Sequence, residues 1–140
     1  MLNEIVFNKT SIPATLKSLD AAMLRSRVIA NNIANLTTPG YQRIDVQFED
    51  QFRKALDQNA LQGTRTSEKH LPLGRSDLAA VNPMVEKPNE ETMPGGINNV
   101  DIDEEMAKLA ETQIMFNFGA RFVRDRIKTI NASIKGSVIQ

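Results

Sequence analysis

A long stretch near the C-terminal end of the sequence, with the period of a coiled coil, constrains the fold most. Between residues 102 and 134, the ten positions spaced alternately by four and three residues are apolar except for Gln113. A 3.5-residue period held over so many turns predicts a coiled-coil helix about 50 Å long. A chain of 140 residues cannot cover such a helix with a compact core, so the helix needs partners. The ten positions are Ile102, Met106, Leu109, Gln113, Phe116, Ala120, Val123, Ile127, Ile130 and Ile134.

The ends of this stretch carry the signals of helix termini. Asp101 followed by Glu104 is an acidic form of the capping box, which satisfies free backbone N–H groups at a helix start. Acidic residues crowd the first turn and basic residues the last third, as the helix dipole favours. Gly136 is placed to end the helix in the left-handed conformation.

The middle of the predicted helix is apolar on several sides, which is typical of a helix surrounded by others. Gly119 beside Ala120 lets another backbone approach closely. We therefore expect an assembly interface here rather than a cofactor site. Its predicted residues are Leu109, Met115, Phe116, Phe118, Gly119, Ala120, Phe122, Val123 and Ile127.

A second, weaker 3.5-residue pattern predicts a helix over residues 13–35. Pro13 suits its first turn, and Pro39 biases the preceding residue away from helix. Thr38-Pro39-Gly40-Tyr41 has the sequence of a type II turn. The pattern runs through Leu16, Leu19, Met23, Ser26, Ala30 and Ile33.

Three asparagines near the end of this helix, Asn31, Asn32 and Asn35, are unusual because asparagine is a mediocre helix former. One interpretation is that their amides satisfy carbonyl groups at a crowded helix end, or fix the register against a partner. The other is a frayed, solvated terminus. The residues themselves leave both interpretations open.

The fold class predicted from these patterns is mainly α, with two long terminal helices pairing as an antiparallel coiled coil. We expect residues 1–39 and 98–140 to form one discontinuous domain and residues 40–97 a connecting arm. Within the arm, alternating residues 44–48 predict a short strand and residues 50–60 a short helix. Residues 61–100 show no period and are rich in proline and glycine, which predicts an irregular segment with room for one small hairpin.

Composition excludes several functions. The 17 basic and 17 acidic residues balance, which argues against nucleic-acid binding, and the absence of cysteine excludes disulfides and thiolate sites. His70 is the only histidine and no second metal ligand stands at a suitable spacing, so we expect no catalytic, metal or cofactor site. No segment is apolar enough to span a membrane. The N-terminal residues lack the features of a Sec signal peptide.

The sequence also resembles a known family. Residues 26–41, SRVIANNIANLTTPGY, closely resemble the N-terminal signature of the bacterial flagellar rod and hook family, and residues 99–106, NVDIDEEM, resemble the start of the C-terminal helix in its shortest members. The resemblance covers both ends of the chain and implies a structural subunit of the flagellar basal-body rod. The assembly interface expected in the signature comprises Asn31, Asn32, Ile33, Asn35, Pro39, Gly40 and Tyr41.

This resemblance also implies partners and a location. The expected partners are other rod subunits (FlgC-like and FlgF-like), FliE-like and MS-ring base components, and the flagellar type III export apparatus. The expected location is the periplasmic rod of the basal body, reached without a Sec signal peptide. Three alternatives stay open: another rod subunit of the same family, a coiled-coil adaptor that does not polymerise, and an enzyme such as a peptidoglycan hydrolase.

Overall fold

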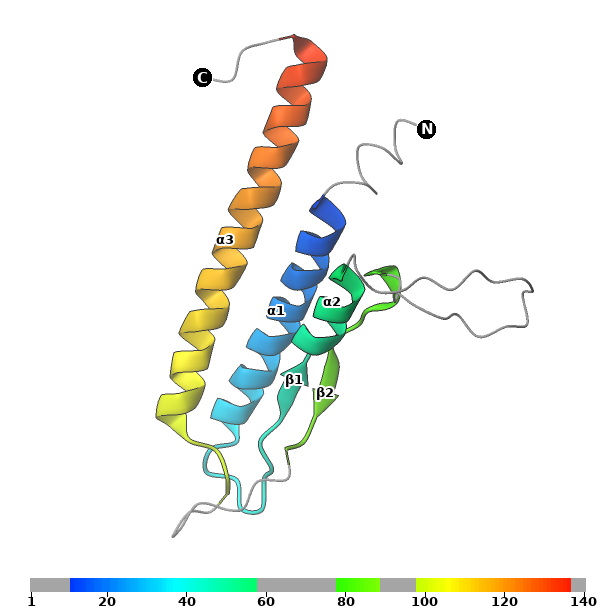
Figure 1. Ribbon diagram of the computed structural model, residues 1–140. Coiled ribbons are helices and arrows are strands. Elements are labelled where there is room, and N and C mark those ends of the chain that lie inside the picture. Colours follow the sequence, from blue (N-terminus) through cyan, green and yellow to red (C-terminus); the bar gives the residue numbers. More distant parts are fainter. Residues whose placement is uncertain (1–10, 58–77, 89–97, 137–140) are drawn as a thin grey trace, which may run out of the picture.

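Two long helices dominate the molecule. The computed structural model describes residues 11–57, 78–88 and 98–136. Helix α1 (Ile12–Ala34) and helix α3 (Ile102–Lys135) lie side by side and run in opposite directions (Figure 1). The predicted pairing of two terminal helices in a mainly α fold is confirmed. None of the described helices is long and apolar enough to cross a membrane.

The local signals at both ends of α1 act as predicted. Pro13 lies in the first turn and the helix ends at Ala34. In the following turn, the Tyr41 N–H donates to the Thr38 carbonyl at 3.3 Å, and Gly40 has a φ of 72°. A positive φ at the third position of the turn defines type II and favours glycine there.

The predicted caps of α3 are also present. The Asp101 carboxylate accepts hydrogen bonds from the backbone N–H groups of Asp103 at 2.8 Å and Glu104 at 3.4 Å. The reciprocal half of the capping box does not form, because the Glu104 carboxylate pairs with Lys108 one turn later. Gly136 ends the helix with a φ of 64°.

The arm between the helices contains a small two-stranded sheet. Strand β1 (Asp45–Gln47) pairs antiparallel with β2 (Met84–Glu86), and Val46 lies opposite Val85. The pair is not a tight hairpin, because helix α2 (Glu49–Leu56) and the 3₁₀ turn η2 (Leu78–Ala80) lie between the strands in sequence. Helix α2 ends before the predicted residue 60, and residues 58–77 and 89–97 lie outside the described part of the chain.

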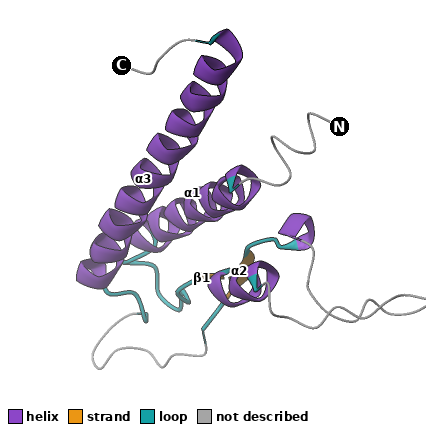
Figure 2. Cartoon of the chain, turned by 45° about the horizontal axis from the view of Figure 1, so that its top comes forward, coloured by secondary structure: helices purple, strands orange, loops and turns teal. Residues whose placement is uncertain are grey.

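The arm packs against α1 over a small apolar cluster that joins Ala21 of α1 to Phe48, Ala55 and Val81 of the arm. The rings of Phe48 and Phe52 stack with their centroids 4.8 Å apart. Figure 2 shows α2 and β1 beside α1, away from α3. The division of the chain into a helix domain and an arm domain remains a prediction.

The buried line of α3 differs from the predicted seam. The two buried positions of α3 are Glu105 and Thr112, whereas the seam residues Ile102, Met106 and Ile127 are about half exposed. Among the described helices and strands, α1 is the main neighbour of α3, and it covers only one side of that helix. In addition, Gly119 lies beside Thr15, near the start of α1, so the last turns of α3 extend beyond it (Figure 1).

Candidate functional site

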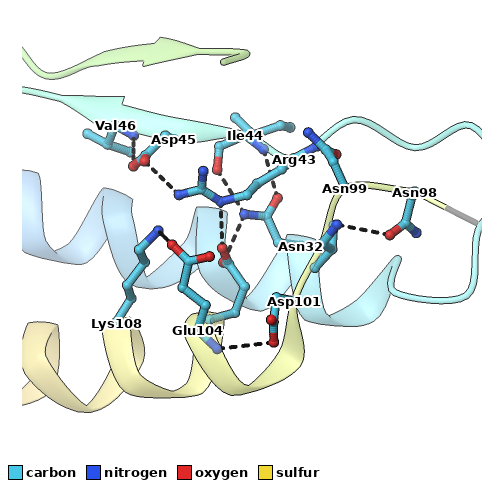
Figure 3. A network of polar contacts seen from close by, with 12 residues as sticks. Asn32, Arg43, Ile44, Asp45, Val46, Asn98, Asn99, Asp101, Glu104 and Lys108 are labelled. Carbon is cyan, nitrogen blue, oxygen red and sulfur yellow. Dashed lines mark hydrogen bonds and ion pairs between the residues drawn. The ribbon is translucent and has the colours of Figure 1, made fainter. Parts of the chain in front are cut away.

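A buried polar cluster lies where the end of α1, the start of β1 and the start of α3 meet, and Asn32 is at its centre. The Asn32 amide nitrogen donates to the Ile44 carbonyl at 2.8 Å and to Glu105 Oε2 at 2.9 Å. Its oxygen accepts from the Ile44 N–H and the Tyr41 hydroxyl, both at 3.0 Å. All four hydrogen-bonding positions of the amide are therefore used, and the side chain is fully buried. Figure 3 shows Asn32 directed at the backbone of Ile44.

Arg43 and Glu105 form a buried ion pair in the same cluster. Arg43 Nε donates to Glu105 Oε1 at 2.8 Å, and the two side chains are 5% and 1% exposed. A terminal nitrogen of Arg43 also donates to Asp45 at 2.9 Å (Figure 3). The attraction in such a pair largely offsets the cost of removing both charges from water, so the net gain is small. Removal of one partner, in contrast, leaves an uncompensated buried charge.

Tyr41 links the type II turn to this cluster. Burial of its phenol, together with the nearby Glu105 carboxylate, raises the pKa of Tyr41 above its usual value. The phenol is protonated at neutral pH, and its hydroxyl group donates a hydrogen bond to the side-chain oxygen of Asn32.

Two asparagines before α3 hold the end of α1 and the chain that follows it. The Asn98 amide nitrogen donates to the carbonyls of Leu36 at 2.7 Å, Asn35 at 3.1 Å and Thr38 at 3.3 Å. The Asn99 side-chain oxygen accepts from the Arg43 N–H at 2.7 Å. The last carbonyls of a helix lack partners within it. From about 60 positions away in sequence, Asn98 thus holds the C-cap residue Asn35 and the carbonyls of the turn that follows α1.

The other predicted residues of the signature lie at the edge of the cluster. The Asn35 amide donates to the Asn31 carbonyl at 2.8 Å and accepts from the Thr38 hydroxyl at 3.2 Å. Asn35 thus satisfies a carbonyl at the helix end, as the first interpretation expects, whereas the carbonyl that Asn32 satisfies belongs to Ile44, outside the helix. Asn31, Pro39 and Gly40 are exposed, and Ile33 is partly buried.

The predicted interface residues of α3 divide between two sides of the helix. A Cβ atom at Gly119 would lie 3.0 Å from Leu19 Cδ2, so the expected close approach is made by α1 of the same chain. Met115, Phe118 and Ile127 are exposed. The Arg126 guanidinium lies over the partly buried Phe122 ring, 5.1 Å from its centroid. The remaining members are partly buried: Leu109, Phe116, Ala120 and Val123.

Sequence reasoning missed Arg43, Glu105, Asn98 and Asn99. By its position in the sequence, Glu105 is one of several acidic residues that suit a helix start. Its spacing of seven residues from Thr112 places both on one helix face, and this was the available signal. No such sequence signal exists for Arg43, because a charged residue before a strand is normally exposed.

Within residues 11–57, 78–88 and 98–136, no group of three or more His, Cys, Asp or Glu side chains could hold a metal ion. His70 lies outside these ranges. The hydrogen bonds of Asn32 and the ion pair between Arg43 and Glu105 hold three distant segments of the chain together.

Comparison with known proteins identifies the family. The model of the flagella basal body rod protein family matches residues 19–42. The flagellar basal body rod protein FlgB of Borreliella burgdorferi is 35% identical over 130 residues, which cover 89% of this chain and 96% of the relative. FlgB of Bacillus subtilis is 28% identical, with 85% and 88% covered, and FlgB of Salmonella typhimurium is 26% identical, with 86% and 89% covered.

The match with the Borreliella protein extends over nearly the full length of both sequences. The family match covers most of α1 and the type II turn, which supply Asn32 and Tyr41 to the polar cluster. The chain therefore belongs to the FlgB family of flagellar basal body rod proteins, structural subunits of the proximal rod.

Proposed function

We propose that the subunit assembles into the rod through the exposed apolar surface of its helix pair. The observation that carries this proposal is the exposure of Ile114, Met115 and Phe118, which are 69%, 67% and 72% accessible in the middle of α3. Large exposed apolar patches mark interaction sites. A contact between two different surfaces of one chain produces a ring or a helical filament rather than a closed dimer.

The predicted interface residues then have two roles. Exposed residues such as Asn31, Pro39, Phe118 and Ile127 would contact neighbouring subunits. The buried Asn32 instead holds the end of α1 in the shape that the contact requires. The role is structural rather than enzymatic, and a lytic assay of purified protein on peptidoglycan, with no activity expected, tests that statement.

The proposed neighbours are FlgC-like and FlgF-like rod subunits and the FliE-like and MS-ring base, in the periplasmic part of the basal body. The proposed route is the flagellar type III export apparatus. The names of the relatives, which place them in the basal body rod, support this proposal.

The test is recovery of an epitope-tagged chain in purified basal bodies, with Phe118→Asp compared to Asn131→Asp. Both positions are exposed on α3, so both variants should fold with unchanged unfolding midpoints. Phe118→Asp should be exported and absent from basal bodies, whereas Asn131→Asp should be incorporated. Absence of the unaltered chain from basal bodies would favour the adaptor alternative.

A further inference from the structure

The helix pair presents two apolar surfaces that differ in shape. The first, which we name the outer ridge, consists of Ile114, Met115 and Phe118, all more than 65% exposed. Thr112 and Phe116 face α1. Ile114 and Phe118 each follow one of these by two residues, which is about 200° around the helix axis. Ile114 and Phe118 therefore point away from α1, and Met115 lies at the edge of the ridge on the α2 side, where it lines a depression with Leu19 and Phe52.

The second surface is a depression between the two helices, on the side of the pair away from α2. This side groove has a volume of about 240 Å³. Small-molecule sites usually measure about 300–1,000 Å³ and hold several convergent polar groups, so a small ligand is a poor occupant. Inserted side chains suit the groove better. It is lined by Met23, Ser26, Arg27, Gln113 and Phe116.

Charges of opposite sign flank the two surfaces. Glu111 and Arg121 stand at the two ends of the outer ridge, one helical turn before Met115 and one after Phe118. Arg27 lines the side groove, and Asp20 lies one turn before Met23 on the same face of α1. All four are exposed, and none of them forms an ion pair with another described residue.

The charges that flank the outer ridge and those that flank the side groove also lie at similar positions along the axis of the helix pair. Gly119 lies beside Leu19, and Gln113 lies beside Met23 and Ser26. Because the helices are antiparallel, Asp20 lies near the level of Arg121, and Arg27 near the level of Glu111. Two copies in the same orientation and at nearly the same height would therefore bring both pairs of opposite charges together.

We infer that the outer ridge of one subunit inserts into the side groove of a second copy of this chain, with Glu111 opposite Arg27 and Arg121 opposite Asp20. This inference rests on the proposed rod function and names the neighbour at that surface. The contact is heterologous, so repeated copies form a ring or a shallow helix. The apolar side chains supply the buried area, and the charges set the orientation.

The absence of cysteine from the chain allows a direct test by cross-linking. Cells would express two differently tagged copies, one with Ser26→Cys and one with Ile114→Cys, and purified basal bodies would be treated with a short bis-maleimide. A mixed product carrying both tags is expected. Basal bodies with only one of the two variants should give none, and neither should Ser26→Cys combined with Asn131→Cys.

Charge reversal tests the orientation. In the cross-linking background, Arg27→Glu and Glu111→Arg should each lower the mixed product by about twofold to fivefold, the effect of a surface ion pair. The two changes together should restore it. Basal bodies that contain the chain but give no mixed product, or no restoration, would overturn the inference and leave the rod function standing. Absence of the chain from basal bodies would overturn both.

Discussion

Arg43 donates a hydrogen bond from Nε to Glu105 Oε1 across 2.8 Å, and the two residues are 62 positions apart in the sequence. One precedes β1 and the other lies in the first turns of α3. Asn32 at the end of α1 donates to the other oxygen of the same carboxylate. A single buried glutamate thus joins the end of α1, the segment before β1 and the start of α3, and its removal should have a large effect.

Replacement of Glu105 by alanine should lower the free energy of unfolding by about 3–5 kcal/mol, because Arg43 would remain buried without a counter-charge. The matched control is Glu104→Ala, which removes an exposed pair with Lys108 worth about 0.3–0.5 kcal/mol. Urea unfolding of both variants gives the comparison. Equal midpoints for the two would contradict the role assigned to the buried pair.

Asn32→Ala should destabilise the protein, whereas Asn31→Ala should slightly stabilise helix α1. The first leaves both backbone groups of Ile44 without their side-chain partner, at a cost of about 1–3 kcal/mol for each buried unsatisfied group. The second replaces an exposed asparagine with a better helix former and should raise helicity slightly. Circular dichroism during urea titration measures both effects. A stable, well-folded Asn32→Ala variant would show that the amide network is dispensable.

Gly119→Leu should destabilise the isolated subunit, because the new side chain points at Leu19 of α1. Overpacking typically costs about 1–3 kcal/mol, more than the roughly 1 kcal/mol gained in helix propensity. Gly119→Ala should be close to neutral, since the contact at 3.0 Å is with the flexible end of Leu19. A compensating Leu19→Ala change should recover part of the stability of Gly119→Leu. If Gly119→Leu is as stable as the parent, the close approach of the helices is wrong.

Tyr41 should titrate above its normal pKa in the folded protein. A group with a raised folded-state pKa stabilises the fold below the unfolded-state value of about 10, and the contribution is lost as pH rises through the folded-state pKa. The chain has one tyrosine and no tryptophan, so tyrosinate absorbance reports on Tyr41 alone. Folded and urea-unfolded protein would be compared. Identical titration curves would show that the phenol is not held in the cluster.

Asp101→Ala should cost about 1 kcal/mol, because the carboxylate caps two backbone N–H groups at the start of α3. Asp103→Ala is the matched control, since it removes a charge from the same turn without removing the cap. Thermal unfolding of the two variants distinguishes capping from the general effect of negative charge. Equal losses would assign the effect to the helix dipole.

The features that the sequence determined alone are those with local causes. Pro13 and Asp101 mark the starts of the two long helices, Gly136 marks the end of the second, and Pro39 with Gly40 makes the turn. Each of these acts on backbone groups within a few residues, so no knowledge of distant segments is needed. The apolar periods likewise predicted that two helices would pair.

Tertiary structure decided which faces pair and where polar groups are buried. The predicted seam through Ile102 and Met106 is exposed, whereas Glu105 is buried, because its burial depends on Arg43 and Asn32 arriving from elsewhere in the chain. No local pattern encodes that meeting. A carboxylate at a helix start has a sufficient local reason to be acidic, and only the assembled fold shows that this one is compensated and enclosed.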